Sequence, residues 1–301
     1  MRDVSAKVDT LRTAVARAVL TAAPETLDAI HEGRAPKGDP LPVAKVAAIQ
    51  AAKNTPQIIP YCHSVPLDYV GVDFEMARDS ITVTVEVKAI YKTGVEMEAL
   101  TAAAAAALNL YDLLKIIDDT MEIQGVTLLS KTGGKSNVPA SEGFSARVVV
   151  VSDSAADGTR EDRSGALLVE GLREHGADAP APVIVPDDAE AIRAAVLEAC
   201  HDAPDFVFTT GGTGLGPRDV TPEAVADLFE QDLPGVEDHL RAYSGRRIPL
   251  AMLSRLRAGR RGRTILVCLP GSPGAVKDAL AALFPYIRHA AHVMQGGGHG
   301  G

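Results

Sequence analysis

The stretch FVFTTGGTGLGPRDVTPEA, residues 206–224, decides the fold that we predict for the second half of the chain. An apolar strand runs into a glycine-rich loop, and a segment with the composition of a helix start follows. Comparable strand and helix patterns alternate on both sides of it. Strands are expected at residues 146–152, 181–186, 205–210 and 264–270, and helices at 165–176, 188–201, 222–230 and 275–284. This order predicts a largely parallel sheet with helices on both faces.

The glycine-rich loop of this stretch predicts a phosphate site. Thr213 supplies a hydroxyl, and four glycines are expected to leave their backbone N–H groups free just before a helix begins; they are Gly211, Gly212, Gly214 and Gly216. Such loops favour phosphate groups. The loop lacks the Gly-Lys-Ser/Thr ending of a Walker A motif, and Pro217 breaks the GxGxxG spacing. A tight turn without a ligand is the alternative.

Two aspartates are expected beside this loop. Asp219 follows the loop and Asp187 ends the segment APVIVPD, so both lie at the carboxyl edge of the predicted sheet, where ligands bind. Each could be only the N-cap of the helix that follows it. Alternatively, two carboxylates beside a phosphate loop organise Mg²⁺ for phosphoryl or nucleotidyl transfer. A later loop, LPGSPG at residues 269–274, adds further backbone N–H groups and Ser272.

The length and the use of basic residues predict two domains. The chain has 301 residues, and nine of its ten lysines lie between Lys7 and Lys135, whereas fifteen of its twenty arginines lie from Arg147 onward. Between these regions lies GGKSNVPASEGFS, residues 133–145, which has the composition of a linker. We expect domains at residues 1–141 and 146–301, with the boundary near residue 142.

The net charge of −9 argues against binding of nucleic acids or anionic membranes, which need a positive field. No run approaches the roughly 18 apolar residues of a membrane helix, and the first residues do not resemble a secretory signal. The three cysteines, Cys62, Cys200 and Cys268, are odd in number and show no CxxC spacing. A reducing, cytoplasmic location is therefore expected.

The first half predicts a mixture of helices and strands. Residues 8–22 show helical spacing, and residues 44–53 form a second, short helical segment. The alternating run ITVTVEV within residues 80–90 predicts a strand. After Gly94, residues 95–118 predict a helix of about 24 residues, whose alanine run favours helix intrinsically.

Charged residues of the first half point to phosphate and acid–base chemistry. Lysines beside Gly, Pro or Asn turns could converge on a triphosphate, although any one of them could equally be a solvated charge; they are Lys37, Lys53, Lys131 and Lys135. Asp112 and Lys115 are three residues apart and share a helix face. They form either a surface ion pair or an acid–base pair, and the flanking apolar residues are expected to desolvate them partly.

Helix geometry separates two of these candidates. Glu98 and Asp112 are fourteen residues apart, which is about 21 Å along a helix, so a site that uses both would lie between two subunits. Cys62 and His63 follow an apolar run, but a metal site would need further ligands at set spacing. A buried or ligand-contacting histidine is the favoured interpretation.

The first half resembles the MoaC family across residues 2–137, through DVSAK, KGD, IQAAK, IPYCH, KTGVEMEALTAAAAAALNLYD and LLSKTGGKS. The resemblance implies an α+β, ferredoxin-like fold, an oligomer built on dimers, and conversion of 3′,8-cyclo-7,8-dihydro-GTP to cyclic pyranopterin monophosphate and pyrophosphate. No tightly bound cofactor is expected there. It implies substrate contacts at Lys53, Tyr61, Cys62, His63, Met97 and Glu98, and catalytic or triphosphate-facing roles for Lys37, Asp112, Lys115 and Lys131. Tyr61 and Ser64 depart from the usual Leu and Pro.

The second half resembles the MogA/MoaB family across residues 146–295, through SDSAADGTREDRSG, VPDD, TTGGTGLGPRDVTPEA and LPGSPGAVKDAL. This resemblance implies a three-layer α/β molybdopterin-binding fold, a trimer, and adenylylation of molybdopterin with MgATP. Asp187 and Asp219 match the catalytic acids and would hold Mg²⁺. Nucleotide or molybdopterin contacts are expected at Gly211, Gly212, Thr213, Gly214 and Ser272.

Together these observations predict a bifunctional enzyme of molybdenum cofactor biosynthesis that acts on small pterin and nucleotide substrates. A dimer-shared site in one domain and a trimer in the other favour a hexamer. As an alternative, the second domain would be a non-catalytic molybdopterin carrier or a trimerising scaffold, which has no reason to keep both Asp187 and Asp219. A generic nucleotide hydrolase would explain the glycine loop but not the first half.

Overall fold

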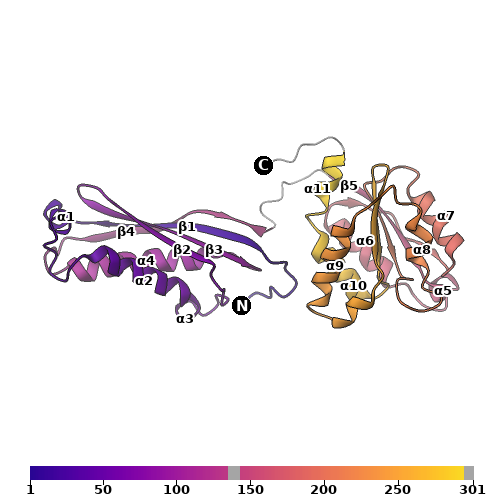
Figure 1. Ribbon diagram of the computed structural model, residues 1–301, viewed down its shortest axis with the longest axis horizontal. Coiled ribbons are helices and arrows are strands. Elements are labelled where there is room, and N and C mark those ends of the chain that lie inside the picture. Colours follow the sequence, from indigo (N-terminus) through magenta and orange to yellow (C-terminus); the bar gives the residue numbers. More distant parts are fainter. Residues whose placement is uncertain (135–142, 295–301) are drawn as a thin grey trace. The chain divides into compact units, whose positions relative to one another are not determined.

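The computed structural model describes residues 1–134 and 143–294 (Figure 1). The chain divides into two compact units, Met1–Asn137 and Val138–Gly301. The predicted boundary near residue 142 lies outside the described residues. No helix in the described ranges is long and apolar enough to cross a membrane.

The first unit is a four-stranded antiparallel sheet covered by helices on one face (Figure 1). Its strands lie in the order β2-β3-β1-β4. They are β1 (Thr10–Thr21), β2 (Tyr69–Met76), β3 (Ser80–Tyr91) and β4 (Glu122–Thr132). The helices are α1 (Pro24–His31), α2 (Pro40–Lys53), α3 (Thr55–Ile58) and α4 (Glu96–Leu114). The expected strand at residues 80–90 is confirmed as β3.

Strand β1 corrects one expectation, because the helix predicted over residues 8–22 is wrong. Ala14, Ala16, Ala18 and Leu20 are buried at every second position, and the residues between them point to the other face. β1 is central and pairs along most of its length with both β3 and β4. Alanine favours helix locally, but pairing on both sides and burial of one face outweigh that weak preference.

Helices α2 and α4 form the layer over the sheet. Helix α4 has 19 residues rather than the predicted 24, and α2 begins at Pro40, where the Asp39 side chain caps it by accepting from the Leu41 N–H. Fully or almost fully buried alanines line the contact; they are Ala44, Ala48, Ala52, Ala99, Ala102, Ala103, Ala106 and Ala107. Such small side chains let the two backbones approach closely, so the long helix is held rigidly along its length.

The second unit is a seven-stranded, mostly parallel sheet in the order β6-β5-β8-β11-β10-β9, with β7 also pairing with β5. The strands are β5 (Phe144–Val151), β6 (Ala177–Asp178), β7 (Val183–Val185), β8 (Phe206–Thr210), β9 (Gln231–Asp232), β10 (Arg257–Arg261) and β11 (Thr264–Leu269). Among the described strand pairs of this sheet, β9–β10 and β10–β11 are antiparallel and the others are parallel. The predicted mostly parallel sheet is confirmed, whereas the antiparallel edge was not anticipated.

Helices cover both faces of this sheet, as predicted (Figure 1). The helical elements are α5 (Asp153–Ala156), α6 (Ser164–Glu174), α7 (Ala189–Ala199), α8 (Thr221–Ala226), α9 (Pro234–Gly245), the 3-10 turn η2 (Pro249–Leu253), α10 (Pro273–Leu283) and α11 (Arg288–Met294). One buried cluster joins the sheet to α6, α9 and α10, and another joins it to α7 and α8. In the first cluster the rings of Phe144 and Phe284 stack, with their centroids 5.5 Å apart. The carboxyl ends of β5, β7, β8 and β11 are thereby fixed along one edge.

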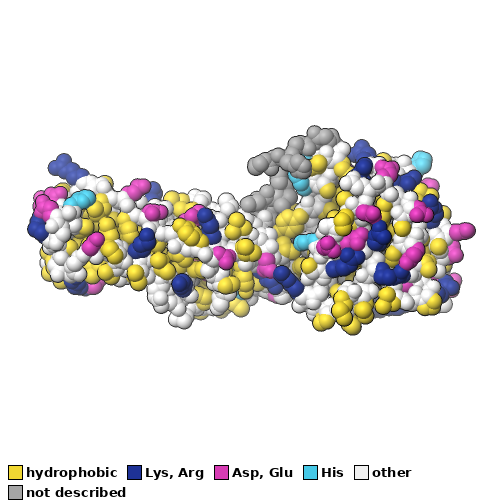
Figure 2. Space-filling model, viewed as in Figure 1, with side chains coloured by type: hydrophobic (Ala, Val, Ile, Leu, Met, Phe, Trp, Pro, Cys, Tyr) yellow, Lys and Arg dark blue, Asp and Glu magenta, His cyan; other side chains and the backbone are white. Residues whose placement is uncertain are grey.

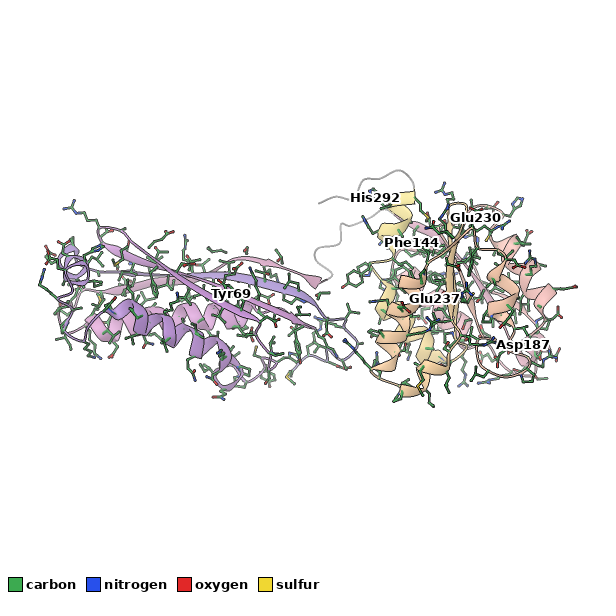
Figure 3. All side chains as sticks on the ribbon, in the orientation of Figure 1. Tyr69, Phe144, Asp187, Glu230, Glu237 and His292 are labelled. Carbon is green, nitrogen blue, oxygen red and sulfur yellow. The ribbon has the colours of Figure 1, made fainter. Side chains whose placement is uncertain are left out.

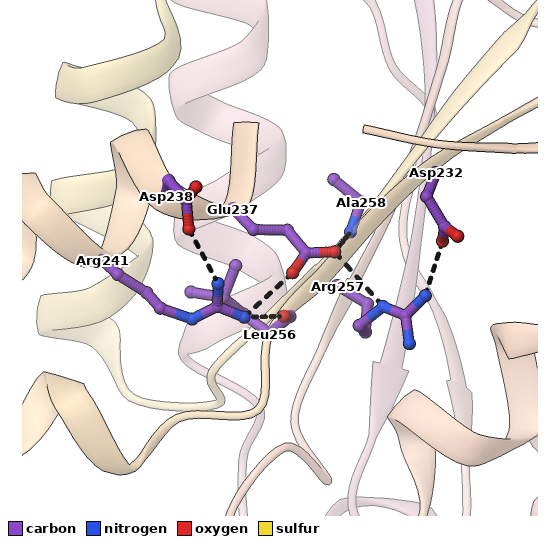
Figure 4. Close-up of polar contacts among 7 residues, drawn as sticks. All are labelled: Asp232, Glu237, Asp238, Arg241, Leu256, Arg257 and Ala258. Carbon is purple, nitrogen blue, oxygen red and sulfur yellow. Dashed lines mark hydrogen bonds and ion pairs between the residues drawn. The ribbon is translucent and has the colours of Figure 1, made fainter. Parts of the chain in front are cut away.

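A buried carboxylate ties the antiparallel edge to α9 (Figure 4). Glu237 accepts hydrogen bonds from the Ala258 N–H at 3.0 Å, from Arg241 at 3.0 Å and from Arg257 at 3.2 Å. Arg257 also pairs with Asp232 at 2.5 Å, which links β9 to β10. These contacts fix the chain segment that leads into β10 and carries Arg255.

Charged side chains of both signs are interspersed over the visible face of the second unit (Figure 2). The candidate ligand-binding side chains lie at the two ends of α4 and beyond the carboxyl ends of β5, β7 and β8.

Candidate functional sites

The first cluster lies at the C-terminal end of α4. The Asp112 carboxylate pairs with the Lys115 ammonium at 2.6 Å and with the Lys37 ammonium at 3.2 Å. Lys37 also donates to the Asp112 backbone carbonyl at 3.2 Å. The predicted contact between Asp112 and Lys115 is present, and Lys37, which lies in the turn before α2, joins it. Two predicted catalytic lysines, Lys37 and Lys115, therefore both contact the predicted catalytic carboxylate of Asp112.

This cluster is exposed, so the expected desolvation is wrong. The side chain of Asp112 is 56% exposed, and the neighbouring Ile116 and Ile117 are themselves 61% and 42% exposed. Hydrogen bonds from Lys115 and Lys37 hold the pKa of Asp112 below its ordinary value, and the same contact raises the pKa of Lys115. At neutral pH two ammonium groups therefore flank one carboxylate, and the excess positive charge suits a phosphorylated ligand.

The second cluster lies at the N-terminal end of α4 and is buried. Glu98 is only 1% exposed; its Oε1 accepts a hydrogen bond from the Cys62 thiol at 3.4 Å, and its Oε2 has no hydrogen-bond partner among the described residues. Burial raises the pKa of Glu98. Burial and the neighbouring Glu98 raise the pKa of Cys62 to about 11. Burial therefore shifts both groups toward their protonated forms relative to the same groups in water.

Other predicted residues surround this end of α4. Lys131, from β4, pairs with Glu96 in the first turn of α4 at 3.1 Å. A His63 ring nitrogen lies 2.8 Å from the Arg2 carbonyl oxygen. Met97 is 37% exposed and Tyr61 is 79% exposed, so both can be reached from solvent. Lys53 is exposed at the end of α2.

One chain does not bring all of these residues together. Helix α4 is continuous from Glu96 to Leu114, so the fourteen residues between Glu98 and Asp112 correspond to about 21 Å. The first unit therefore presents two separate clusters, one buried around Glu98 and the other exposed around Asp112.

The glycine loop of the second unit has the conformation that requires glycine. Gly211 and Gly212 have φ values of +110° and +63°, and a Cβ on Gly211 would lie 2.1 Å from the Val151 carbonyl oxygen. The Gly211 N–H donates to Leu269 at 3.0 Å and the Gly216 N–H donates to Asp219 at 2.8 Å. The prediction of free N–H groups is therefore wrong for Gly211 and Gly216. Among the described residues, the N–H groups of Gly212, Thr213 and Gly214 have no hydrogen-bond partner.

Arg255 holds the carbonyl side of this loop. Its Nε donates to the Gly214 carbonyl at 2.8 Å, its backbone N–H donates to Thr213 at 2.9 Å, and its guanidinium also contacts the Asp219 carbonyl and Glu223. The carbonyl groups are thereby engaged, and the N–H groups are left for a ligand. Sequence reasoning missed Arg255, because it lies in an arginine-rich segment without a local motif.

Neither predicted aspartate is a helix cap, which removes the simplest alternative for both. Val220 is the N-cap of α8 and makes no side-chain cap hydrogen bond, whereas the Asp219 carboxylate accepts from Gly216 and closes the loop. Asp188, not Asp187, caps α7 by accepting from the Ala191 N–H at 2.9 Å. Asp187 is labelled in Figure 3.

Asp187 is tied to a third acid that sequence reasoning did not select. The Asp187 carboxylate accepts from the Asp153 N–H at 2.9 Å, and the Asp153 carboxylate accepts from the Asp187 N–H at 3.0 Å. Arg218 completes the group, with its Nη2 2.7 Å and 2.6 Å from the two oxygens of Asp153. Asp153 could have been found from its position directly after the apolar run of β5, at the same edge of the sheet.

The loop before α10 packs against the glycine loop. A Cβ on Gly271 would lie 3.1 Å from the Gly211 Cα, and the Ser272 hydroxyl caps α10 by accepting from the Ala275 N–H. A cavity of about 200 Å³ lies beside this loop. Its walls are mostly apolar, with Ser254 and Asp278 among its polar residues. Asp278 pairs with Arg247 at 3.0 Å, and the buried Ser254 hydroxyl has no partner among the described residues.

Comparison with known proteins shows to which family the chain belongs. Residues 1–134 match the sequence model of the MoaC family, and residues 147–289 match the one described as "Probable molybdopterin binding domain". A molybdenum cofactor biosynthesis bifunctional protein from Chlorobaculum tepidum is 45% identical over 299 residues, which is 99% of this chain and 96% of that protein. The chain belongs to this bifunctional family.

Two further relatives match the halves separately. A cyclic pyranopterin monophosphate synthase from Corynebacterium efficiens is 50% identical over 136 residues, or 45% of this chain and 88% of that protein. The solved structure of the molybdopterin biosynthesis enzyme MoaB from Thermus thermophilus is 37% identical and covers 51% of this chain and 97% of its own, with a TM-score of 0.48. The family-model matches and the bifunctional relative from Chlorobaculum tepidum show that the chain joins a MoaC domain to a MogA/MoaB-like domain and is an enzyme of molybdenum cofactor biosynthesis.

The donor atoms of the MogA/MoaB-like domain suit a hard cation. Among the described residues no group of three or more His, Cys, Asp or Glu side chains is arranged to hold a metal ion by itself. The carboxylates of Asp153 and Asp187 lie at adjacent strand ends, and Mg²⁺ in nucleotide sites is commonly held by one or two carboxylates together with substrate phosphates. These residues fit a magnesium ion that arrives with a nucleotide.

Proposed function

We propose that the MoaC domain converts 3′,8-cyclo-7,8-dihydro-GTP to cyclic pyranopterin monophosphate and pyrophosphate. The Lys37–Asp112–Lys115 cluster carries this proposal, because it joins ammonium groups to a carboxylate that can move protons. Lys37, with Lys53 and Lys131, binds the triphosphate, while Asp112 and Lys115 exchange protons with the substrate. The name of the Corynebacterium efficiens relative supports this activity.

The buried cluster has the complementary role of binding the uncharged part of the substrate. When protonated, the buried Glu98 carboxyl donates as well as accepts a hydrogen bond, and the Cys62 thiol contacts it at 3.4 Å. Tyr61, His63 and Met97 provide the neighbouring contact surface.

A complete site in the MoaC domain would combine the two ends of α4 from different copies. Glu98 and Asp112 cannot reach the same small ligand within one chain, because they are about 21 Å apart along one helix. Mixing two inactive full-length variants, Glu98→Gln and Asp112→Asn, tests this arrangement. Shared sites restore activity to about one quarter of the wild-type level, since about half of the dimers are mixed and one of the two sites in each mixed dimer has both residues intact. Mixtures as inactive as their components would contradict the shared site.

We propose that the MogA/MoaB-like domain adenylylates molybdopterin with MgATP. The three free N–H groups of Gly212–Gly214, beside the Asp153–Asp187 pair, support this function. The N–H groups bind phosphate, Asp187 and Asp219 would hold Mg²⁺ beside Asp153, and Asp219 also fixes the loop by accepting from the Gly216 N–H. Bound Mg²⁺ neutralises charge on the phosphates during transfer. The apolar cavity between α9 and α10 accommodates the pterin ring, with Ser254 as an available hydrogen-bond group and Ser272 at its rim.

The adenylylation test combines the full-length protein with molybdopterin, ATP and Mg²⁺, and follows adenylylated product and pyrophosphate. Asp187→Asn should abolish product formation, and Asp188→Asn is the matched control because Asp188 only caps α7. An inactive wild type whose MoaC domain is active would leave the MogA/MoaB-like domain as a molybdopterin carrier or a trimerising scaffold.

We also propose a ferredoxin-like fold for the MoaC domain, the domain limits, a hexameric assembly and a cytoplasmic location. The sheet order β2-β3-β1-β4, with two helical connections on one face, supports a ferredoxin-like MoaC domain. We propose domain limits of 1–141 and 146–301, and the family matches to residues 1–134 and 147–289 support them. A hexamer follows from a dimer-shared site joined to a trimer. The three unpaired cysteines support a cytoplasmic location.

A further inference from the structure

Arg218 connects three chain segments at the edge of the MogA/MoaB-like sheet. It lies in the loop between β8 and α8, and its Nη2 reaches both carboxylate oxygens of Asp153, which follows β5. The same nitrogen lies 3.4 Å from the backbone carbonyl of Asp187, beyond β7. The side chain of Arg218 is 65% exposed and that of Asp153 is 40% exposed, so the ion pair is open to solvent.

This position places a positive charge on Asp153, one of the two carboxylates that suit Mg²⁺, and beside the backbone carbonyl of the other, Asp187. Both oxygens of Asp153 are engaged by the guanidinium, and one of them also accepts from the Asp187 N–H. A divalent cation that approaches Asp153 and Asp187 meets this charge and finds fewer open lone pairs. Without a nucleotide, Arg218 therefore competes with the metal.

Arg218 is also suitably placed for an anionic ligand. It precedes Asp219 and belongs to the same loop as the free N–H groups of Gly212–Gly214. The other arginine at this loop, Arg255, is committed to loop carbonyls and to Glu223. A planar guanidinium binds phosphate as readily as carboxylate. Because exposed ion pairs contribute little stability, exchanging one anionic partner for another has a low energetic cost.

We propose that Arg218 is a phosphate ligand for the nucleotide and that, before the nucleotide binds, it occupies the carboxylate of Asp153, beside Asp187. When phosphate draws the guanidinium away, the Asp153 carboxylate becomes open to Mg²⁺ next to that of Asp187. Nucleotide and metal then assist each other's binding, and the metal site opens only when there is a phosphate to act on. This inference rests on the proposed use of MgATP by the domain and assigns its order of assembly to one residue.

The test measures metal and nucleotide binding separately on the full-length protein. Mn²⁺ binding without nucleotide is followed by equilibrium dialysis, and ATP binding without divalent metal by calorimetry. The variants are Arg218→Ala and Arg218→Gln, and Arg193→Ala is the matched control because it removes an exposed arginine that pairs with Asp227 in the same domain. Arg218→Ala should tighten Mn²⁺ binding by about 3-fold to 10-fold and weaken ATP binding by about 10-fold, since a charge-assisted contact is removed from the phosphate and a competing charge from the metal.

The two affinities are expected to change in opposite directions, with Mn²⁺ binding tighter and ATP binding weaker, and this contrast makes the result decisive. A structural role for Arg218 would weaken both affinities together, and that outcome, or an unchanged Mn²⁺ affinity in both variants, would overturn the inference. Arg218→Gln repeats the measurement with an uncharged side chain of similar length, so a folding defect limited to the alanine variant does not decide the result. A wild-type protein that binds neither Mn²⁺ nor ATP would instead overturn the proposed adenylylation, and this inference with it.

Discussion

Replacement of Gly211 by alanine should strongly destabilise the MogA/MoaB-like domain. Its φ of +110° lies in the left-handed region, and an added Cβ would lie 2.1 Å from the Val151 carbonyl oxygen. The backbone conformation costs a non-glycine residue about 1–3 kcal/mol. The clash costs about 1–3 kcal/mol more, because Val151 ends a central strand and can move only with its neighbours. The expected loss of unfolding free energy is therefore about 2–6 kcal/mol.

Two other glycines separate these contributions. Gly158 has a φ of +69° with open space around its Cβ position, so Gly158→Ala carries the conformational cost alone, about 1–2 kcal/mol. Gly274 lies within α10 with open space and no positive φ, so Gly274→Ala should be neutral or stabilise by about 0.5–1 kcal/mol. Hydrogen exchange of the full-length protein measures the free energy of opening of β8 in each variant. Peptides from β1 and β3 serve as an internal reference, because they belong to the MoaC domain, which these substitutions do not touch. If Gly211→Ala cost no more than Gly158→Ala, the close approach to Val151 would be refuted.

Two further predictions concern buried carboxylates. Burial raises the pKa of Glu98 above its ordinary value of 4.5. As the pH rises above 4.5, the unfolded chain therefore loses a proton that the folded protein still holds. The free energy of unfolding should fall until the pH reaches the pKa of Glu98 in the folded protein. Glu98→Gln should remove this pH dependence, so the melting temperature of the variant should rise relative to that of wild type as the pH increases from 5 to 8. Wild-type and variant melting temperatures that change in parallel with pH would contradict this prediction. Glu237→Ala should lower the unfolding free energy of the MogA/MoaB-like domain by about 3 kcal/mol, because it leaves Arg241, Arg257 and the Ala258 N–H without their shared acceptor. Exchange of β10 amides measures this loss, and protection equal to wild type would contradict it.

Local pattern predicted most of the MogA/MoaB-like fold but not all of the MoaC fold. Strands such as β8 and β11 are buried on both faces and read as continuous apolar runs, so the sequence shows them directly. Strand β1 is rich in alanine, and the choice between helix and strand there depends on pairing with β3 and β4, whose residues are far away in the sequence. The antiparallel edge was missed because β9 and β10 are short and carry charged residues.

The same distinction applies to the sites. The contact between Asp112 and Lys115 follows from a spacing of three residues on a helix, whereas Lys37 joins it from 75 residues away. In the segment VPDD the sequence does not decide which aspartate caps α7, and the structure gives that role to Asp188. The contact between Arg218 and Asp153 spans 65 residues and depends on the order of parallel strands. Contacts within one element could be predicted, but contacts between elements needed the fold.

The most direct test of the account measures both activities on one protein and on two single variants. Full-length wild type should form cyclic pyranopterin monophosphate from 3′,8-cyclo-7,8-dihydro-GTP and should adenylylate molybdopterin with MgATP. Asp112→Asn should lose the first activity by about 100-fold or more and keep the second, and Asp187→Asn should do the reverse. Loss of both activities in either variant, or a wild type without adenylylation, would contradict two independent phosphate-ligand sites.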